Sequence, residues 1–349
     1  MEGNPFSLNF GVEPASYIAR TQQTEEVSRN FLADPSPAHV YLFTGVLGSG
    51  KTVLLAEMED RFRQEGWVVC DLSIESDLLE SFAAKLYNVE KFRALFSQAR
   101  INLSHFGFGV ELHGVPPVTD IGTAIEQMMA VLRKQKKKVL IAIDEAVGSA
   151  SMRRFVSEFQ ILLRAKYPVY LLMTGLYENI YGLQNEKTMT FLYRAPKIAL
   201  SPLSLPDMTE QYRRIFHSSF EHARDMACMT RGYSYAYQVL GYLCWEKQTD
   251  RLTEDVLDEF DLYMFEYAYG KIWEEQSPTK RKILSAMAAS GERQVTAVRE
   301  AVGLSPQAFS VYRSRLIRQG VLEADGYGRI EFALPRFDVF VRERDSLML

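Results

Sequence analysis

The stretch VYLFTGVLGSGKTVLLAEM, residues 40–58, passes from an apolar segment through three glycines to a lysine and a threonine. Residues 40–44 are typical of a buried strand, and residues 51–65 of a helix that ends at Gly66. The junction fits the pattern G-x-x-x-x-G-K-[S/T] at every fixed position, with Gly45, Val46, Leu47, Gly48, Ser49, Gly50, Lys51 and Thr52. This pattern between a strand and a helix predicts a phosphate-binding loop.

The residue types of this loop suit a nucleoside triphosphate. Glycines let the backbone wrap so that successive N–H groups point at phosphate oxygens. The helix that begins at Lys51, with Val53 in its first turn, adds the positive end of its dipole. We expect Lys51 to reach the β- and γ-phosphates and the Thr52 hydroxyl to bind Mg²⁺. A glycine-rich turn that binds nothing is the alternative, and the strand and helix on either side count against it.

A second motif, VLIAIDEA at residues 139–146, ends an apolar strand in two acids. Open parallel sheets bind ligands at the carboxyl ends of their strands, where Asp144 would stand. We expect Asp144 to hold Mg²⁺ through water and Glu145 to polarise an attacking water, which favours hydrolysis over binding alone. Two solvated acids at a strand end are the alternative, which the phosphate-binding loop makes less attractive.

Apolar strands alternate with helices in the first half of the chain. Further strands are expected at 67–73, directly before Asp144 and at 167–175, with helices at 51–65, 119–135 and 151–166. Continuous apolar strands that alternate with helices predict a parallel sheet covered on both faces, an α/β nucleotide-binding core. Residues 101–114 alternate in polarity, which predicts a β-hairpin that turns near Gly107 to Gly109.

Composition limits the class of protein. At 349 residues the chain is expected to form two or three domains. Cys70, Cys228 and Cys244 lie far apart without a CxxC pair, which argues against a disulfide framework and a zinc site. The N-terminus lacks the features of a secretory signal, and no apolar run approaches the length of a membrane span. We therefore expect a cytoplasmic protein without a membrane partner.

The chain changes character after Pro206. Residues 207–269 read as successive helices. Serine–proline pairs then begin helices at 277–278 and 305–306, with a short helix at 296–302 between them. Residues 321–334 alternate around Asp325-Gly326, which predicts a hairpin. Three helices followed by a hairpin form a winged helix-turn-helix.

Charge bears on what this last unit binds. Residues 271–349 hold 13 Lys and Arg against 10 Asp and Glu, a net charge of +3, which leaves −7 on the rest of a chain of net charge −4. The third helix is predicted to present Gln307, Ser310, Arg313, Ser314 and Arg318 outward and Phe309, Leu316 and Ile317 inward. This asymmetry favours double-stranded DNA as a partner, through Arg313, Arg318 and Arg329. Winged helices also dock on proteins or pack within their own chain, so a protein partner or self-association stays open.

The P-loop, the Asp-Glu strand and the segment LLMTGLYENIYGLQ (171–184) together resemble an AAA+ type ATPase. More narrowly, the chain resembles, over about residues 4–345, the archaeal and bacterial ATPase group allied to origin-recognition-type initiators and to STAND signalling ATPases. This resemblance implies an α/β P-loop ATPase core at 1–205 that includes an N-terminal entry segment, a helical lid at 206–270 and a winged helix domain at 271–349.

The resemblance also implies roles for three residues. Thr174 occupies the strand end where the family places a polar sensor of the γ-phosphate, more often asparagine. Arg194 stands near the position of an arginine that meets nucleotide in the same or a neighbouring subunit. Ile18, in a segment similar to the N-terminal box of the family, would line an adenine pocket. A hydroxyl bonded to backbone is the alternative for Thr174, and a surface cation the alternative for Arg194.

Three functions are compatible with these motifs. The first is a switch that binds ATP with Mg²⁺, hydrolyses it slowly to ADP and binds DNA through the winged helix. The second is a STAND-like signalling or defence ATPase whose winged helix contacts protein. The third is a small-molecule kinase or other nucleotide enzyme, against which the Asp144-Glu145 pair counts. Guanine recognition would need an N/T-K-x-D element, which residues 174–179 do not supply, so adenine is expected.

Overall fold

The computed structural model describes residues 3–9, 11, 14–108, 112–186 and 189–346. It divides into two compact units. One, here called the sheet unit, comprises Thr21–Thr44 and Lys51–Ile198, and the other, the helical unit, comprises Met1–Arg20, Gly45–Gly50 and Ala199–Leu349. The sequence predicts a division by function into an ATPase core at 1–205, a lid at 206–270 and a winged helix domain at 271–349. This division stays a prediction.

The sheet unit is built on a five-stranded sheet in the order β2-β3-β4-β1-β5. Its strands are β1 (Val40–Thr44), β2 (Val68–Leu72), β3 (Val139–Ile143), β4 (Val169–Gly175) and β5 (Lys197–Ala199). β4 lies between β1 and β3, and both pairings are parallel, with Phe43 opposite Thr174 and Ile143 opposite Met173. The carboxyl ends of β1, β3 and β4 therefore meet at one edge, as predicted for the α/β core.

The central strands form because their side chains are apolar on both faces. Every residue of β1, β3 and β4 is buried. Each Val, Leu, Ile, Phe or Met side chain that leaves water in this way contributes about 1.5–3 kcal/mol. Such burial requires helices on both faces of the sheet, because an exposed apolar face would remain in water.

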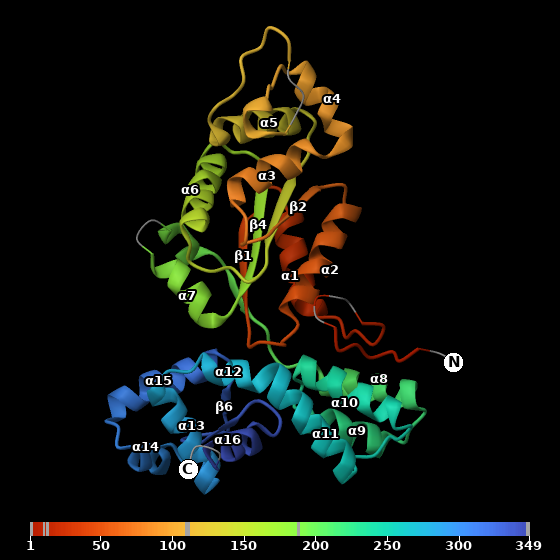
Figure 1. Ribbon diagram of the computed structural model, residues 1–349, viewed down its shortest axis with the longest axis vertical. Helices are drawn as coiled ribbons and strands as arrows, with labels where there is room; N and C mark the ends of the chain where they lie inside the picture. Colours follow the sequence, from red (N-terminus) through yellow and green to blue (C-terminus); the bar gives the residue numbers. More distant parts are fainter. Residues whose placement is uncertain (1–2, 10, 12–13, 109–111, 187–188, 347–349) are drawn as a thin grey trace. The chain divides into compact units, whose positions relative to one another are not determined.

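Helices supply this cover (Figure 1). α1 and α2 lie on one side of the sheet, and α6 and α7 lie on the other. Side chains of Asp77, Asp120 and Ser149 cap α3, α5 and α6, each cap contributing about 1 kcal/mol. The helices are α1 (Thr21–Leu32), α2 (Lys51–Gln64), α3 (Leu78–Tyr87), α4 (Glu90–Gln98), α5 (Ile121–Lys134), α6 (Ala150–Arg164) and α7 (Tyr177–Asn185), with short 3-10 helices η1 (Ser104–Phe106) and η2 (Thr190–Arg194).

The predicted hairpin at 101–114 is wrong over its described residues. Residues 101–108 and 112–114 contain η1 and no strand, and 109–111 lie outside the described residues. The Asn102 side chain organises the segment instead, because its amide donates to the Val115 carbonyl at 2.7 Å and accepts from the Ser104 N–H at 3.1 Å. Phe106 and Phe108 pack against the core of the sheet unit, so the alternating apolar positions serve packing rather than strand pairing.

The helical unit gathers the N-terminal segment, the glycine loop and the second half of the chain. Phe6 packs against Tyr212, Phe216 and Tyr237, and a side chain at Gly241 would place its Cβ 2.3 Å from the Phe6 ring. The elements of this unit are α8 (Leu205–Phe216), α9 (Phe220–Met229), α10 (Ser234–Glu246), α11 (Glu254–Met264), the π-helical turn η3 (Phe265–Tyr269), α12 (Gly270–Glu274), α13 (Pro278–Ser290), α14 (Val295–Val302), α15 (Pro306–Arg318), β6 (Leu322–Ala324), β7 (Ile330–Phe332) and α16 (Phe337–Ser346).

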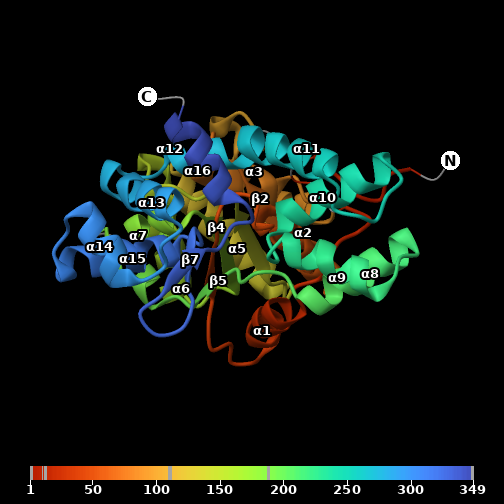
Figure 2. The ribbon, with the colours of Figure 1, turned by 90° about the horizontal axis from the view of Figure 1, so that it is seen from below.

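The last part of this unit confirms the predicted winged helix-turn-helix. α13, α14 and α15 are followed by the antiparallel pair β6–β7, and Figure 2 shows β7 next to α15 and α16. Left-handed glycines, Gly291 and Gly303, end α13 and α14, while the Ser305 hydroxyl caps α15. We call the hairpin segment 321–334 the wing.

Across the residues for which coordinates are described, every helix is too short or too polar to cross a membrane.

The three cysteines give a direct test of this packing. Cys70 and Cys244 are buried and Cys228 is exposed. Burial raises the pKa of Cys70 and of Cys244 to about 12, so at pH 8 only about one in ten thousand of these thiols is the reactive thiolate. We expect a thiol reagent at pH 8 to label Cys228 within minutes and the other two only in denaturant. Rapid labelling of all three in the native protein would contradict the fold.

Candidate functional site

The ends of β1 and β3 bring together two residues that are 92 positions apart in the sequence. Thr52 lies in the first turn of α2, which follows β1, and Asp144 follows β3 directly. The Thr52 hydroxyl donates to Asp144 Oδ2 at 2.6 Å. The sequence motifs therefore meet in space as expected, because parallel strands end at the same edge of the sheet.

Thr174 completes this cluster from β4, the strand between the other two. Its side chain is fully buried, and its hydroxyl donates to Asp144 Oδ1. The same hydroxyl accepts from the Glu145 N–H at 3.3 Å, and this N–H also donates to Asp144 Oδ1 at 2.9 Å. Thr174 thus bonds to a side chain and to backbone, and its expected role as a sensor of the γ-phosphate stays a prediction.

Glu145 adopts an unusual backbone conformation beside this cluster. Its φ is 51°, in the left-handed region that side chains other than glycine rarely enter. Such a conformation costs about 1–3 kcal/mol and persists where surrounding contacts determine it. Here the two bonds of its N–H and the bond from the Ala146 N–H to the Thr174 carbonyl, at 2.8 Å, fix the turn. The Glu145 side chain is left exposed at the strand edge.

The oxygen atoms of this cluster fit a magnesium ion that arrives with a nucleotide. Thr52 Oγ1 and Asp144 Oδ2 are hard oxygen donors held side by side. Within the described ranges there is no group of three His, Cys, Asp or Glu side chains that could hold a metal ion. Magnesium at this pair would therefore take its other ligands from water and phosphate, which is its usual mode in phosphate-handling proteins.

The glycine loop Gly45–Gly50 belongs to the helical unit, where its carbonyl groups are bonded one after another. The Leu47 carbonyl accepts from the Tyr233 hydroxyl at 2.5 Å, and the Gly48 carbonyl from the Tyr235 N–H at 3.1 Å. The Ser49 carbonyl accepts from the Ser234 hydroxyl at 3.1 Å. These carbonyls are therefore bonded to residues at the start of α10, and phosphate binding by the loop's N–H groups stays a prediction.

Gly48 is required by this packing. Its φ is +74°, and a Cβ there would lie 2.5 Å from the Tyr233 hydroxyl oxygen and 2.9 Å from Tyr235 Cβ. The Ser49 hydroxyl is buried and has no hydrogen-bond partner among the atoms described. A buried hydroxyl left in this way fits a loop that accepts an oxygen-rich ligand, since buried polar groups are nearly always bonded.

Arg20 is the residue that the sequence reasoning missed. Its guanidinium donates to the Ser49 carbonyl at 2.9 Å, to the Ser201 carbonyl at 2.6 Å and to the Ser234 hydroxyl at 3.4 Å. The side chain is 7% exposed, and this burial lowers the pKa of Arg20 from its ordinary value. The sequence feature that points to Arg20 is the N-terminal segment SYIAR, in which the family resemblance assigns a role to Ile18 alone.

The other predicted residues are placed as follows. Lys51 is buried at the start of α2, and Val53 is half-buried two residues later. Ile18 is buried in the core of the helical unit. Arg194 ends η2 and is exposed, and it forms no ion pair with any residue in the described part of the chain. The roles expected for these residues stay predictions.

Comparison with known proteins places this arrangement. A family described as a domain of unknown function (DUF8462) matches residues 266–341. No protein of curated function matches the sequence. A Walker-type ATPase of Pyrococcus abyssi is similar in structure, with a TM-score of 0.67 at 14% identity over 93% of this chain and 96% of that chain. The ORC2 protein of Aeropyrum pernix, in ADPNP and ADP complexes, gives 0.58 at 13% identity over 98% of each chain.

These similarities concern the fold. The chain has the fold of AAA+ P-loop ATPases related to origin-recognition-type proteins, with an α/β core followed by helices and a winged helix. The resemblance inferred from the P-loop and the Asp-Glu strand is confirmed at this level.

The bonding of Thr174 predicts a stability effect. Thr174→Val keeps the shape of the side chain but removes the hydroxyl that bonds Asp144 and the Glu145 N–H. We expect it to lower the free energy of unfolding, measured by urea denaturation, by about 1–3 kcal/mol, because buried groups lose a partner. Thr296→Val, at an exposed threonine of α14, is the control and should change it by less than about 0.5 kcal/mol. Equal effects would show that the cluster does not stabilise the fold.

Proposed function

We propose that this protein is an ATP-binding molecular switch that hydrolyses ATP slowly and couples this turnover to DNA binding through its winged helix. The observation that carries the proposal is the Asp144 carboxylate, which accepts from Thr52 of the P-loop motif and from Thr174 of the neighbouring strand. A magnesium ion that arrives with phosphate needs such a pair of oxygen ligands. An acid that merely ends a strand would have no need of a bond to the threonine of the P-loop motif.

The proposed roles of the residues follow from their chemistry. The glycine loop and Lys51 would bind the phosphates, with Val53 beside them and Ile18 lining the adenine pocket. Thr52 and Asp144 would hold magnesium, which offsets phosphate charge when it is bound. Glu145, exposed at the strand edge, would orient the attacking water.

Sensing of the γ-phosphate is assigned to Thr174 and Arg194. Thr174 contacts both Asp144 and the backbone of Glu145, so a change at its hydroxyl reaches the magnesium ligand and the proposed base. Arg194 is exposed, and a guanidinium is suited to pair with phosphate oxygens in its own chain or in a neighbouring subunit. Loss of the γ-phosphate would release these contacts and change the conformation.

DNA binding rests on the exposed face of α15. Gln307, Ser310 and Arg318 are exposed as expected, while Arg313 and Ser314 are half-buried. Arg315 is exposed instead. Arg329 lies on the wing and pairs with Asp325 at 3.2 Å. Arg315 and Arg318 are therefore the side chains that we propose for contact with the phosphate backbone, with Arg329 added from the wing.

The second candidate is a STAND-like signalling or defence ATPase whose winged helix contacts protein. Val311 is exposed on the same face of α15, and Tyr327 is fully exposed on the wing. Exposed aliphatic and aromatic side chains of this kind are suited to contact with a protein partner. This alternative keeps ATP, magnesium and the roles of the P-loop residues, and changes only the partner.

Variants of the two motifs test nucleotide chemistry. Lys51→Ala should abolish binding of a fluorescent ATP analogue, because the phosphates lose their cation. Glu145→Gln should bind the analogue as the wild type does and lower phosphate release by at least about 100-fold, since a general base contributes that much or more. Glu80→Gln, at an exposed glutamate of α3, is the matched control and should leave both unchanged. Normal turnover by Glu145→Gln would remove Glu145 from the proposed role.

Duplex binding decides between the two candidates. We expect a fluorescent random-sequence duplex to bind in a manner that differs between ATP and ADP and that weakens strongly between about 50 and 200 mM salt. The double variant Arg315→Gln with Arg318→Gln should weaken binding and lower the slope of log affinity against log salt by about two. Arg224→Gln, at an exposed arginine of α9, is the control. An absence of binding in every nucleotide state would favour the protein-binding alternative.

A further inference from the structure

Residues 230–235, the turn after α9 together with the first two residues of α10, contact two separate parts of the helical unit. Toward one side, Tyr233, Ser234 and Tyr235 bond the carbonyl groups of the glycine loop. Toward the other side, Arg231 bonds the wing. We call residues 230–235 the linking turn, because they bond both the glycine loop and the wing. Contacts of both kinds come from neighbouring residues in one turn.

The linking turn is held in one conformation by its own packing. Arg231 and Gly232 have φ of 50° and 75°, and the Tyr233 N–H donates to the Thr230 carbonyl at 2.9 Å. A Cβ on Gly232 would lie 2.6 Å from Pro202 Cβ and 2.7 Å from the Leu203 carbonyl oxygen. The Gly232 carbonyl accepts from the Leu203 N–H at 2.8 Å. A turn packed this closely moves as one piece, because interiors are dense and pass on displacement.

On the loop side, the bond of Tyr233 is the most enclosed. Its side chain is buried, and burial raises the pKa of Tyr233, so the phenol stays protonated and donates to the Leu47 carbonyl. Ser234 and Arg20 both donate to the Ser49 carbonyl, two residues after Leu47. The orientation of the peptide groups in the glycine loop is therefore set by side chains that lie outside the P-loop motif.

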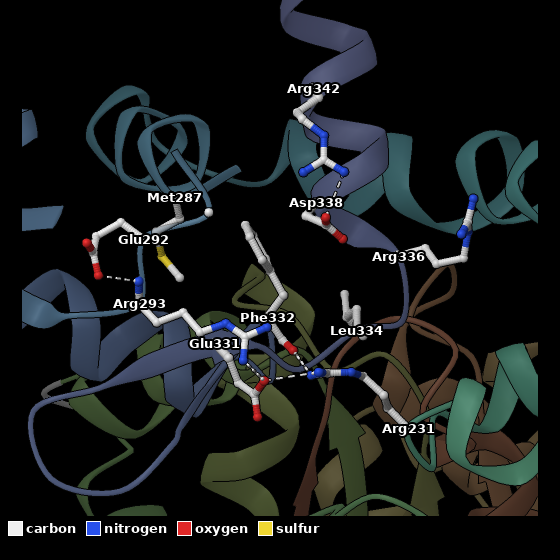
Figure 3. A pocket seen from close by; sticks show the side chains of 11 residues that line it. Arg231, Met287, Glu292, Arg293, Glu331, Phe332, Leu334, Arg336, Asp338 and Arg342 are labelled. Carbon is white, nitrogen blue, oxygen red and sulfur yellow. Dashed lines mark hydrogen bonds and ion pairs between the residues drawn. The ribbon is translucent and has the colours of Figure 1, made fainter. Parts of the chain in front are cut away.

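On the wing side, Arg231 lies against two carboxylates that oppose each other. Glu323 of β6 pairs in register with Glu331 of β7. Arg231 contacts Glu331 at 3.0 Å and Glu323 at 3.3 Å, and it also donates to the Phe332 carbonyl. Figure 3 shows Arg231 reaching Glu331 from one side while Arg293 reaches it from another. Like charges directly opposite on a hairpin repel, so Arg231 holds together a pair of strands that would otherwise be strained.

The wing has room to change position at this contact. A cavity of about 140 Å³ lies beside it, lined by residues that include Arg231, Glu331, Phe332 and Arg342. In Figure 3 the Phe332 ring extends among these charged side chains. Displacement of Arg231 would leave Glu323 and Glu331 opposed and the wing free to rearrange into this space.

We propose that the linking turn couples nucleotide binding at the glycine loop to the position of the wing, with Tyr233 as the positioning residue for the loop and Arg231 as the contact to the wing. The inference rests on the proposed function, since it needs a nucleotide at the loop. Coupling of this kind is reciprocal: a wing that holds Arg231 favours the ordered loop, and a nucleotide that orders the loop favours the docked wing.

The first experiment measures the affinity of a fluorescent ATP analogue with magnesium. Arg231→Gln, and separately the wing double variant Glu323→Gln with Glu331→Gln, should each weaken binding about fivefold or more, which is the usual lower range of coupling between sites. Tyr233→Phe, which removes only the hydroxyl, should also weaken it. The matched controls are Arg224→Gln, Glu343→Gln and Tyr181→Phe, all at exposed side chains, and they should bind as the wild type does.

Combining variants separates coupling from independent damage. If the linking turn joins the two sides, Tyr233→Phe and the wing double variant together should weaken binding by less than the product of their separate effects. Effects that multiply would overturn the proposal, and so would wing variants whose affinity equals that of the wild type. Absence of nucleotide binding by the wild type would instead overturn the proposed function, and this inference with it.

A second measurement needs no variant and guards against misfolding. Amide hydrogen exchange of the wild-type chain should slow in the wing, residues 321–334, when ATP and magnesium are added, because the docked wing is favoured. Exchange in α4, which belongs to the sheet unit and lies outside the linking turn, is the internal reference. Unchanged exchange in the wing while the nucleotide is bound would contradict the coupling.

Discussion

The carboxylate of Asp144 is the group on which the candidate site depends. It accepts from the Thr52 hydroxyl on one oxygen, and from Thr174 and the Glu145 N–H on the other. The start of α2 and the ends of β3 and β4 are thereby joined through one side chain, which the placement of β4 between β1 and β3 in a parallel sheet makes possible. The apolar strands supply the rigid support, and the polar groups at their ends form the candidate site.

The glycine loop depends on a different set of contacts. Its carbonyl groups are bonded by Arg20 and by the linking turn, so the loop is ordered by residues from the N-terminal segment and from the start of α10. Preorganisation of this kind lowers the entropic cost of binding, since the peptide groups need not be reoriented when an anion arrives. The same contacts make the loop sensitive to whatever moves the turn, and the coupling that we propose rests on that sensitivity.

Local patterns predicted much of this structure, and contacts between distant segments were harder to foresee. The P-loop, the strand before Asp144 and the winged helix each carry their signal in consecutive residues. The segment 101–108 misled because aromatic residues that alternate can pack on a core as well as pair in a strand. Arg20 was missed because its acceptors come from Ser49, Ser201 and Ser234, far apart along the chain. On α15, Arg313 follows Phe309 by four positions and precedes Leu316 by three, so helical spacing places it on their buried side and leaves Arg315 exposed on the opposite side.

The left-handed backbone of Glu145 lowers the stability of the fold at the position of the base that we propose. Glycine or asparagine accepts this conformation with less strain, so either would relieve the fold while deleting the carboxylate. Selection for stability alone would therefore tend to replace the proposed base with glycine or asparagine. With the role that we propose for Glu145, the chain gives up about 1–3 kcal/mol of stability to place a carboxylate at this strand end.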